Sequence, residues 1–456
     1  MQGAGPAAAF EAGEPTRAPR RARFSLLWGA AALAVTLHLA LIAYSYPLAV
    51  VLGDLPYGTP DYQTHFHQIS SLVAAYGERG RLWVYDPELL AGFPTGLVFD
   101  VDNKAYFWFV YLLSRVGAPL PAAFNSFAVF VAALAPVSLW VAARALAAPA
   151  AAQLTAYALG VLAWHLDPTA HFCWVGGMIS FAACSAVAAP IIAGFARMLH
   201  ELSGSGDGDD RRRRVVRRWF LGLLVALPLA LLLHAWAFAI LAVPMVYLYL
   251  RRARCLDRGG HLRVWALVAA ALVVNLYWLI PALAHVHLMT PSARVGQATP
   301  VYLLSDFVER VIEEVNTGPL EQHTFTRTAL ILAAIAGACA WRRAGERWRF
   351  EVAVVTLAWL GLLTYAGALI PGLRATEPYR FAVPLTLWSG VIAAPWLRQQ
   401  LAPAALRAAG RETRLVLLAV AALLSARGVH ELLYFIPELE GVQRAAAPGD
   451  RPCRWG

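Results

Sequence analysis

The sequence is poor in charged residues and nearly lacks lysine. Charged residues make up 14% of the 456 residues, whereas a soluble domain has about 25%. Lys104 is the only lysine among the 38 basic residues, so the others are arginines. The five cysteines have no paired spacing and no metal-ligand motif, and we interpret them as small apolar residues. The shortage of charge excludes a soluble globular domain.

Hydrophobic side chains make up 59% of the chain and are gathered in long runs. Runs of roughly 20 apolar residues match the hydrocarbon core of a bilayer, which is about 30 Å thick. The sequence therefore predicts an all-α, polytopic membrane protein with about eleven transmembrane helices. The expected spans cover residues 24–50, 125–146, 151–166, 173–197, 219–233, 235–250, 264–283, 328–341, 350–370, 379–397 and 414–435.

The distribution of arginine predicts the orientation of the chain. Most arginines lie in short loops on one side of the expected spans, and basic loops face the cytoplasm. Residues 1–23 are then a cytoplasmic tail, residues 24–435 the transmembrane domain, and residues 436–456 an outer tail. The long outer loops, 53–124 and 284–326, form the expected active-site face. The net charge of +10 thus reflects membrane topology, and we expect no nucleic-acid partner.

Two apolar segments have lengths that do not fit a single span. Lys104–Val116 has about 13 residues, so we expect a non-spanning amphipathic helix within the first outer loop. Its aromatic side chains are typical of the headgroup level of a membrane. Phe220–Leu250 has about 31 residues and would reach roughly 46 Å, so we expect two spans separated at His234.

The first outer loop carries an acid and an imidazole on one expected helix face. Asp61 is favourable at the start of a helix, and His65 lies four residues on. Ile69, Leu72 and Tyr76 continue this face as an apolar stripe. Polar groups directed toward apolar surroundings need a reason, and a catalytic role is one such reason. The alternative interpretation is a helix-capping aspartate with a structural histidine.

Further acids follow in the same loop. Asp100 and Asp102 lie beside Lys104, and acids near a membrane interface can hold a divalent cation or act as a base. A solvated loop is the alternative. We therefore treat Asp100 and Asp102 as candidate metal ligands and Lys104 as a candidate substrate-binding residue.

A later outer turn, residues 370–381, places Arg374, Glu377 and Arg380 at a membrane boundary. Arginine is costly there unless it is paired or faces a cavity, and guanidinium groups bind phosphate bidentately. These residues are candidates for phosphate binding, with neutralisation of Arg380 by Glu377 as the alternative. His234, between two apolar halves, is a further candidate substrate-binding residue, with a helix-turn histidine as the alternative.

The segment WHLDPTAHFCW holds three potential metal ligands in the second outer loop. His165, Asp167 and His171 do not share one helix, because Pro168 interrupts the segment. The spacing therefore does not favour a metal site.

Several segments resemble, in their order along the chain, those of known membrane proteins. They are Asp61-x-x-x-His65, GRLWVYDPELLAGFPTG, an aromatic non-spanning helix, LYWLIPAL at Leu276–Leu283 and EPYRF at Glu377–Phe381. The chain thereby resembles bacterial and archaeal membrane proteins described as 6-pyruvoyl-tetrahydropterin-synthase-related, and YfhO-type proteins. More distantly it is similar to the C-type glycosyltransferase fold of protein mannosyltransferases and oligosaccharyltransferases.

The resemblance implies an active site between the first outer loop and the membrane, which a polyprenyl-phosphate-linked sugar enters from the bilayer. It implies an aspartate that acts as base or positions the acceptor, and basic residues that bind the lipid phosphate. Asp61 matches the aspartate, and Arg380 is a candidate for the phosphate partner. In the mechanism that we expect, Arg374 helps Arg380 to hold the phosphate. His65 would orient Asp61 or bind phosphate.

The sequence thus predicts a membrane glycosyltransferase that uses a polyprenyl-phosphate donor and a glycan, lipid or protein acceptor. It would act on the outer face of a bacterial plasma membrane, in contact with membrane lipids, with a divalent cation as a candidate cofactor. A lipid-linked sugar transporter or flippase is one alternative, although it needs polar groups near the bilayer midplane. A non-catalytic partner of the same fold is another, supported by FDVDNKAY (residues 99–106), where relatives have Tyr-Tyr-x-Pro-Leu.

Overall fold

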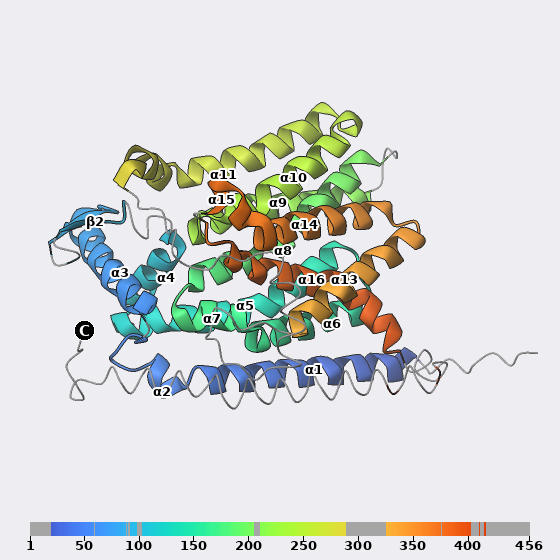
Figure 1. The fold of residues 1–456 in the computed structure, drawn as a ribbon, viewed down its shortest axis with the longest axis horizontal. Helices are drawn as coiled ribbons and strands as arrows, with labels where there is room; N and C mark the ends of the chain where they lie inside the picture. Colours follow the sequence, from blue (N-terminus) through green and yellow to red (C-terminus); the bar gives the residue numbers. More distant parts are fainter. Residues whose placement is uncertain are drawn as a thin grey trace, which may run out of the picture.

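The computed structural model describes residues 20–402, except 59, 88, 90–91, 98–102, 205–209, 289–324 and 375, together with residues 410 and 415. Most of its helices run roughly along one axis and form a bundle (Figure 1). The longer helices are α1 (Arg20–Ser45), α3 (Pro60–Arg79), α4 (Lys104–Arg115), α5 (Leu120–Ala145), α6 (Ala150–Leu166), α7 (Pro168–Gly176), α8 (Ile179–Ser203), α9 (Asp210–Leu233), α10 (Ala237–Arg252), α11 (Arg258–Ala284), α13 (Phe325–Arg343), α14 (Arg347–Ala366) and α16 (Ala382–Gln400). The shorter elements are α2 (Leu48–Val51), α15 (Pro371–Arg374), the 3-10 helices η1 (Ala253–Cys255), η2 (Val286–Leu288), η3 (Gly367–Leu369) and η4 (Pro378–Phe381), and the strands β1 (Val84–Asp86) and β2 (Phe93–Thr95).

Six helices among the described residues are long and apolar enough to cross a membrane, judged by length and composition. They are α1, α5, α8, α9, α11 and α14. Four other expected spans coincide with α6, α10, α13 and α16, of which α6 and α10 have only 17 and 16 residues. The last, residues 414–435, lies outside the described residues apart from Leu415. The structure therefore confirms a helical protein with several apolar helices and does not confirm the count of eleven spans.

Both unusual apolar segments have the expected helix boundaries. α9 ends at Leu233 and α10 begins at Ala237, so the helix break expected at His234 is confirmed. α4 has 12 residues and reaches about 18 Å, which is too short for the hydrocarbon core. The two halves of the split run, as separate spans, stay a prediction.

One expected span begins later than the sequence indicated. Residues 168–176 form the separate helix α7, and α8 begins only at Ile179. The break falls at Gly177, whose φ of 101° is a left-handed conformation that favours glycine. Because both sides of the break are apolar, the hydrophobic run from residue 173 to 197 did not reveal it.

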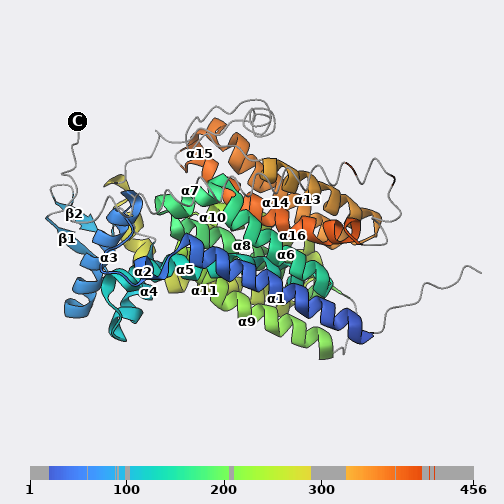
Figure 2. The ribbon, with the colours of Figure 1, turned by 90° about the horizontal axis from the view of Figure 1, so that it is seen from below.

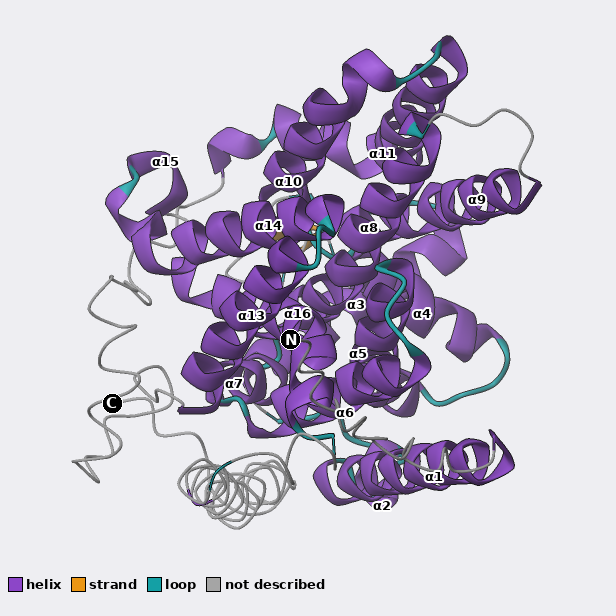
Figure 3. Cartoon of the chain, turned by 90° about the vertical axis from the view of Figure 1, so that its right-hand side faces the viewer, coloured by secondary structure: helices purple, strands orange, loops and turns teal. Residues whose placement is uncertain are grey.

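α8 lies at the centre of the bundle. Its apolar stretch is 94% buried within the protein, against 11% for α1, and it packs against α5, α9, α10 and α16. Small side chains permit this close packing: a Cβ built on Gly194 would lie 2.6 Å from the indole of Trp219. Figure 3 shows α1 at the edge of the bundle, where its apolar side chains are exposed, as expected of a lipid-facing helix.

The first long loop folds into a small cap at one end of the bundle. α2, α3, α4, β1 and β2 gather there, at the left in Figures 1 and 2, and we call this the loop end. β1 and β2 pair antiparallel, with Val84 opposite Thr95. The apolar stripe of α3 faces α4: the ring of Tyr76 makes edge contacts with Phe107, Trp108 and Tyr111.

Candidate active site

Asp61 lies in the first turn of α3, where it meets the end of α7. α3 begins at Pro60, and proline suits a first helical position because its missing N–H has no partner there in any case. A Cβ built on Gly177 would lie 2.6 Å from the backbone nitrogen of Tyr62 and 2.7 Å from Asp61 Cβ. The absence of a side chain at Gly177 therefore lets the end of α7 touch the turn that carries Asp61.

A buried aromatic cluster supports this turn. The hydroxyl of Tyr62 donates a hydrogen bond to the Trp174 carbonyl of α7 at 2.7 Å. Its ring packs on Tyr57 at 5.2 Å and on Phe124 at 6.0 Å. Burial raises the pKa of Tyr62 well above its usual range, and neighbouring Tyr57 and Asp61 raise it further. The turn that carries Asp61 thus rests on a buried, apolar wall.

α7 is fixed by a buried ion pair that the sequence did not reveal. Asp167 caps the helix, and its Oδ1 accepts hydrogen bonds from the backbone nitrogens of Thr169 and Ala170, each at 3.0 Å. Arg327, at the start of α13, donates from Nε to Asp167 Oδ2 at 3.2 Å and from Nη2 to Thr169 Oγ1 at 2.6 Å. The Arg327 and Asp167 side chains are 1% and 0% exposed. An aspartate before a proline signals a helix start, but nothing in the sequence pairs it with Arg327.

The turn around η4, from the C-terminal part of the chain, also contacts α7. Glu377 precedes η4 with a φ of 53°, an uncommon conformation for a residue with a side chain. The hydroxyl of Tyr379 donates to Glu377 Oε2 at 3.4 Å and lies 3.8 Å from Met178 Sδ. Its ring lies 6.2 Å from that of Phe172 in α7. Backbone strain of this kind often accompanies functional sites.

Arg380 is the basic group of this turn. Its side chain is 20% exposed and forms an ion pair with Glu377, which is the alternative partner that the sequence suggested. Its Nε is buried, with no hydrogen-bond partner among the residues described. Burial alone would lower the pKa of Arg380, but Tyr379 and Glu377 raise it above its ordinary value, so the cation is retained.

Cys173 is the buried thiol of α7. Burial raises the pKa of this thiol to about 12; Arg380 lowers it, and the carboxylates of Asp167, Glu377 and Asp61 raise it. α7 also contacts both α3, which carries Asp61, and η4, which carries Arg380. The structure thus brings two segments that are far apart in sequence to the same short helix.

The other predicted residues of the first loop point to α4 and β2. His65 Nδ1 lies 3.4 Å from Asn103 Nδ2, at the start of α4. Lys104 is 1% exposed, and its Nζ donates to the Gly96 carbonyl at 3.2 Å. Lys104 therefore binds the backbone that follows β2 within the cap. Asp100 and Asp102 lie outside the described residues.

The remaining candidates lie at different distances from η4. His234 accepts a hydrogen bond from the Trp236 backbone nitrogen at 3.2 Å, and its ring contacts Phe181 at 5.4 Å. Phe181 in turn contacts Phe381, the neighbour of Arg380, at 6.0 Å. Arg374 is exposed at the end of α15. Within the described part of the chain, no group of three or more His, Cys, Asp or Glu side chains is arranged to hold a metal.

A second polar cluster in the cap went unnoticed in the sequence. His67 Nε2 lies 2.7 Å from Asp86 Oδ2, which also accepts a hydrogen bond from Ser71 Oγ at 3.0 Å. His67 and Ser71 are four residues apart, so their shared helix face was readable. Asp86 comes from β1, and only the hairpin places it beside α3.

No protein-family model matches the chain, and no curated protein sequence matches it. Among solved structures, the chain shares a fold with a glycosyltransferase of the C-type fold. That structure is the archaeal oligosaccharyltransferase AglB from Archaeoglobus fulgidus, in complex with an inhibitory peptide and a dolichol-phosphate. The TM-score is 0.51 at 13% identity, over 92% of this chain and 56% of the other. The apo oligosaccharyltransferase of the same organism has a TM-score of 0.48 at 14% identity, with the same coverage.

At this identity the likeness shows the fold alone, and the fold expected from the sequence resemblance to oligosaccharyltransferases is confirmed. The chain spans little more than half the length of the oligosaccharyltransferase that it matches. The narrower resemblance to the 6-pyruvoyl-tetrahydropterin-synthase-related and YfhO-type proteins stays a prediction.

Proposed function

We propose that this protein is a membrane glycosyltransferase that transfers a sugar from a polyprenyl-phosphate donor. The observation that carries the proposal is that α7 contacts both α3, which carries Asp61, and η4, which carries Arg380. An acid and a phosphate-binding cation are the two groups that the proposed transfer uses. They come from segments more than 300 residues apart, and the fold brings both segments to α7.

In the proposed reaction, Asp61 removes a proton from the acceptor as the acceptor bonds to the anomeric carbon of the sugar. The bond between that carbon and the phosphate oxygen breaks, and polyprenyl phosphate leaves with the electron pair. General-base catalysis of this kind contributes about 10²–10⁴-fold. The guanidinium of Arg380 stabilises the charge that develops on the leaving phosphate. His65 and Arg374 complete the site as the orienting and second phosphate-binding groups.

The Glu377–Arg380 ion pair has a definite place in this scheme. A carboxylate beside the guanidinium holds it in position while no phosphate is present, and the two separate when the donor binds. The oligosaccharyltransferase that shares the fold was solved with a dolichol-phosphate, and this supports a lipid-phosphate donor for the present chain. For the acceptor we retain a glycan, a lipid or a protein. We further propose a bacterial plasma membrane as the location, with the N-terminus in the cytoplasm.

The Glu377–Arg380 pair also favours a second candidate function. If Glu377 neutralises Arg380 permanently, the cation is not available to a phosphate, and the chain is a non-catalytic partner of the same fold. The glycosyltransferase needs the Asp61 carboxylate as a proton acceptor, whereas the non-catalytic partner does not.

The deciding experiment uses a strain that lacks the protein. Lipid and glycan species that change on deletion identify the product, and variants are then tested for its restoration. We expect Asp61→Asn to reduce the product about 10²–10⁴-fold at normal protein level, because the amide caps a helix but accepts no proton. Arg380→Lys keeps the charge and loses the bidentate fork, so it should reduce the product less.

Asp54→Asn is the matched control, because Asp54 is an exposed acid of the same loop. It should restore the product fully. Restoration by Asp61→Asn at wild-type strength would refute the catalytic assignment and support the non-catalytic partner.

A further inference from the structure

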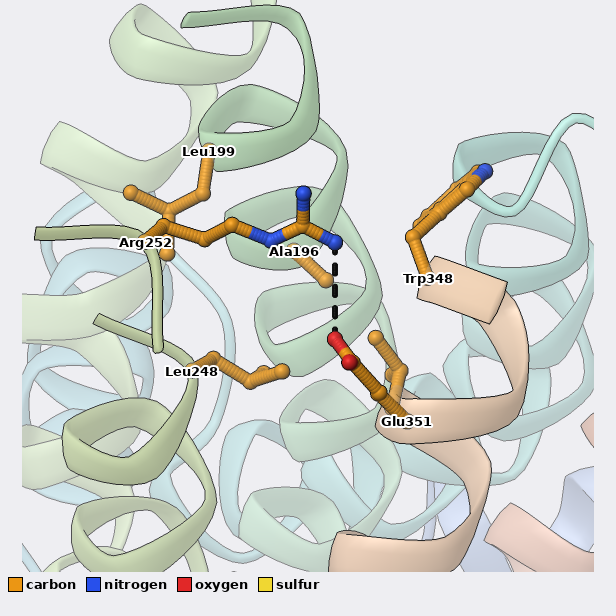
Figure 4. Close-up of a pocket in the computed structure, with 7 residues that line it drawn as sticks. Ala196, Leu199, Leu248, Arg252, Trp348 and Glu351 are labelled. Atoms are coloured by element: carbon orange, nitrogen blue, oxygen red, sulfur yellow. Dashed lines mark hydrogen bonds and ion pairs between the residues drawn. The ribbon is translucent and has the colours of Figure 1, made fainter. Parts of the chain in front are cut away.

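A pocket lies at the end of the bundle opposite the loop end, where α8 and α10 finish and α14 begins (Figures 1 and 4). Its polar lining is Arg252, Trp348 and Glu351, and its apolar lining includes Leu199, Leu248 and Val352. We call this the arginine-rich end, after Arg197, Arg251, Arg252 and Arg349. The 25 residues of α8 rise about 37 Å, so this pocket is remote from Asp61.

One carboxylate in the pocket is shared by two arginines. Glu351 Oε1 lies 3.3 Å from Arg251 and Oε2 lies 3.4 Å from Arg252. Figure 4 shows Arg252 reaching across the pocket toward Glu351, with Trp348 on the far side. Both contacts are longer than the roughly 2.7–2.9 Å of a tight bond between a cation and a carboxylate. Because the two arginines share one carboxylate, their combined charge is only partly neutralised.

The wall formed by Trp348 is surrounded by further cations. The guanidinium groups of Arg197 and Arg349 lie 5.7 Å and 5.5 Å from its ring centre, and the ring of His200 stacks on it at 4.7 Å. Arg197 pairs with Glu201, and Arg349 with Glu346. Around the pocket the described residues thus include four arginines and three glutamates. One positive charge is left without its own carboxylate, and Arg349 Nε is buried with no hydrogen-bond partner among the described residues.

The membrane-facing surface of α14 leads to the same pocket. Val354 and Leu362 are 41% and 40% exposed, and they lie about one and three helical turns beyond Glu351 on the same face of the helix. Apolar side chains exposed on a membrane helix contact lipid tails, and Trp and Arg at its end lie at headgroup level. The pocket is therefore open to the part of a lipid that carries its phosphate.

We propose that this pocket binds the phosphate of an anionic phospholipid from the leaflet at the arginine-rich end. Arg252, with Arg251 beside it, leaves Glu351 and takes the phosphate oxygens, while Trp348 forms the wall of the headgroup site. Basic pockets between membrane helices are suited to such headgroups. This inference does not depend on the proposed glycosyltransferase activity.

The test measures lipid binding to the full chain purified in detergent, by native mass spectrometry. The protein is titrated with phosphatidylglycerol, phosphatidylcholine or inorganic phosphate. We expect phosphatidylglycerol to bind about tenfold more tightly than phosphatidylcholine, and Arg252→Ala to remove this preference, as for the loss of one charge-assisted hydrogen bond. Glu351→Gln should strengthen phosphatidylglycerol binding, because it frees both arginines without removing a cation.

Arg254→Ala is the matched control, since Arg254 is exposed only two residues further on. It should keep the preference for phosphatidylglycerol. Equal losses in Arg252→Ala and Arg254→Ala would show a general attraction to basic loops and would overturn the proposal. Inorganic phosphate that competes at the same concentration as the lipid would show a free-anion site instead. If Arg252→Ala does not fold, an unchanged affinity in Glu351→Gln refutes the pocket by itself.

Discussion

At the scale of single residues, Gly177 joins two parts of the candidate site. Its φ of 101° is unfavourable for any residue with a Cβ, and that Cβ would stand 2.6 Å from the backbone of Tyr62. Gly177→Ala should therefore push α7 away from Asp61, lower stability by about 1–3 kcal/mol and reduce transfer. Thermal unfolding and product analysis in the same preparation measure both effects.

Gly176→Ala is the control for this change. Gly176 is the last residue of α7, and the nearest atoms to an added Cβ are 3.9 Å away, which is ordinary contact. It should be nearly silent in both measurements. Equal effects of the two substitutions would contradict a special role for the position of Gly177.

His171 gives the candidate site a defined response to acid. Burial lowers its pKa to about 3, from about 6.5 in an unfolded chain. Between these two pH values the unfolded state binds the extra proton, so stability falls as the pH falls below about 6.5. From pH 7 to pH 5 the loss amounts to about 2 kcal/mol from this residue.

The measurement is the unfolding temperature of the purified protein between pH 7 and pH 5. His171→Gln should flatten the pH dependence relative to the unaltered protein, even if its stability at pH 7 is lower. An identical slope in the two proteins would mean that His171 does not remain neutral in the folded state.

Residue types and spacing made Asp61 and Arg380 candidates, because charged residues are rare within the apolar runs of the chain. That α3 and η4 both contact α7 could not be predicted, because it depends on how distant segments pack. The partners of Lys104 and Asp86 were equally hidden, since each bond closes over a hairpin or loop rather than one helix turn. The periodicity of a sequence predicts which side chains share one face of a helix. It does not predict which residue of another element such a side chain contacts.

At the scale of elements, α7 is tied to α13 by the buried Asp167–Arg327 ion pair. Both side chains are at most 1% exposed, so removing one leaves a charge without a counter-ion. Arg327→Met should destabilise the protein by about 3–5 kcal/mol, as measured by thermal unfolding. The substitution should loosen α7, because Asp167 caps that helix, and the turn that carries Asp61 packs against it.

The double variant Asp167→Asn with Arg327→Met distinguishes a lost charge pair from lost packing. Asparagine keeps the helix cap and carries no charge, so the double variant should be more stable than Arg327→Met alone. If Asp167→Asn lowers the stability of the Arg327→Met protein further, loss of the ion pair does not explain the destabilisation by Arg327→Met.

Elements that depend on length and charge were the predictable ones. The non-spanning α4 followed from its short apolar segment, and the break at His234 followed from a run too long for one bilayer. The separate α7 was missed, because Gly177 lies within a continuous apolar stretch. A backbone break without a change of hydrophobicity leaves no trace in a hydropathy pattern.

At the scale of the whole molecule, the loop end and the arginine-rich end define its two faces. The proposed orientation sets the arginine-rich end in the cytoplasm and the loop end outside. Cys255, which is exposed in η1 at the arginine-rich end, is a built-in reporter for one face. Tyr85 in β1 is 61% exposed and can be replaced by cysteine to report on the other. Thr95, in the same hairpin, is 0% exposed and would be a poor reporter.

The experiment treats intact cells with a membrane-impermeant thiol reagent after replacement of Cys339 and Cys453. Cys173 and Cys184 are buried and should not react in the folded protein. Cys255 should be protected until the cells are permeabilised, whereas Tyr85→Cys, in a chain whose Cys255 is replaced, should react at once. Labelling of Cys255 in intact cells would show that the protein has the opposite orientation. The positive-inside rule would then fail for this chain. The candidate active site would face the cytoplasm, where its donor would have to present the phosphate from the opposite leaflet.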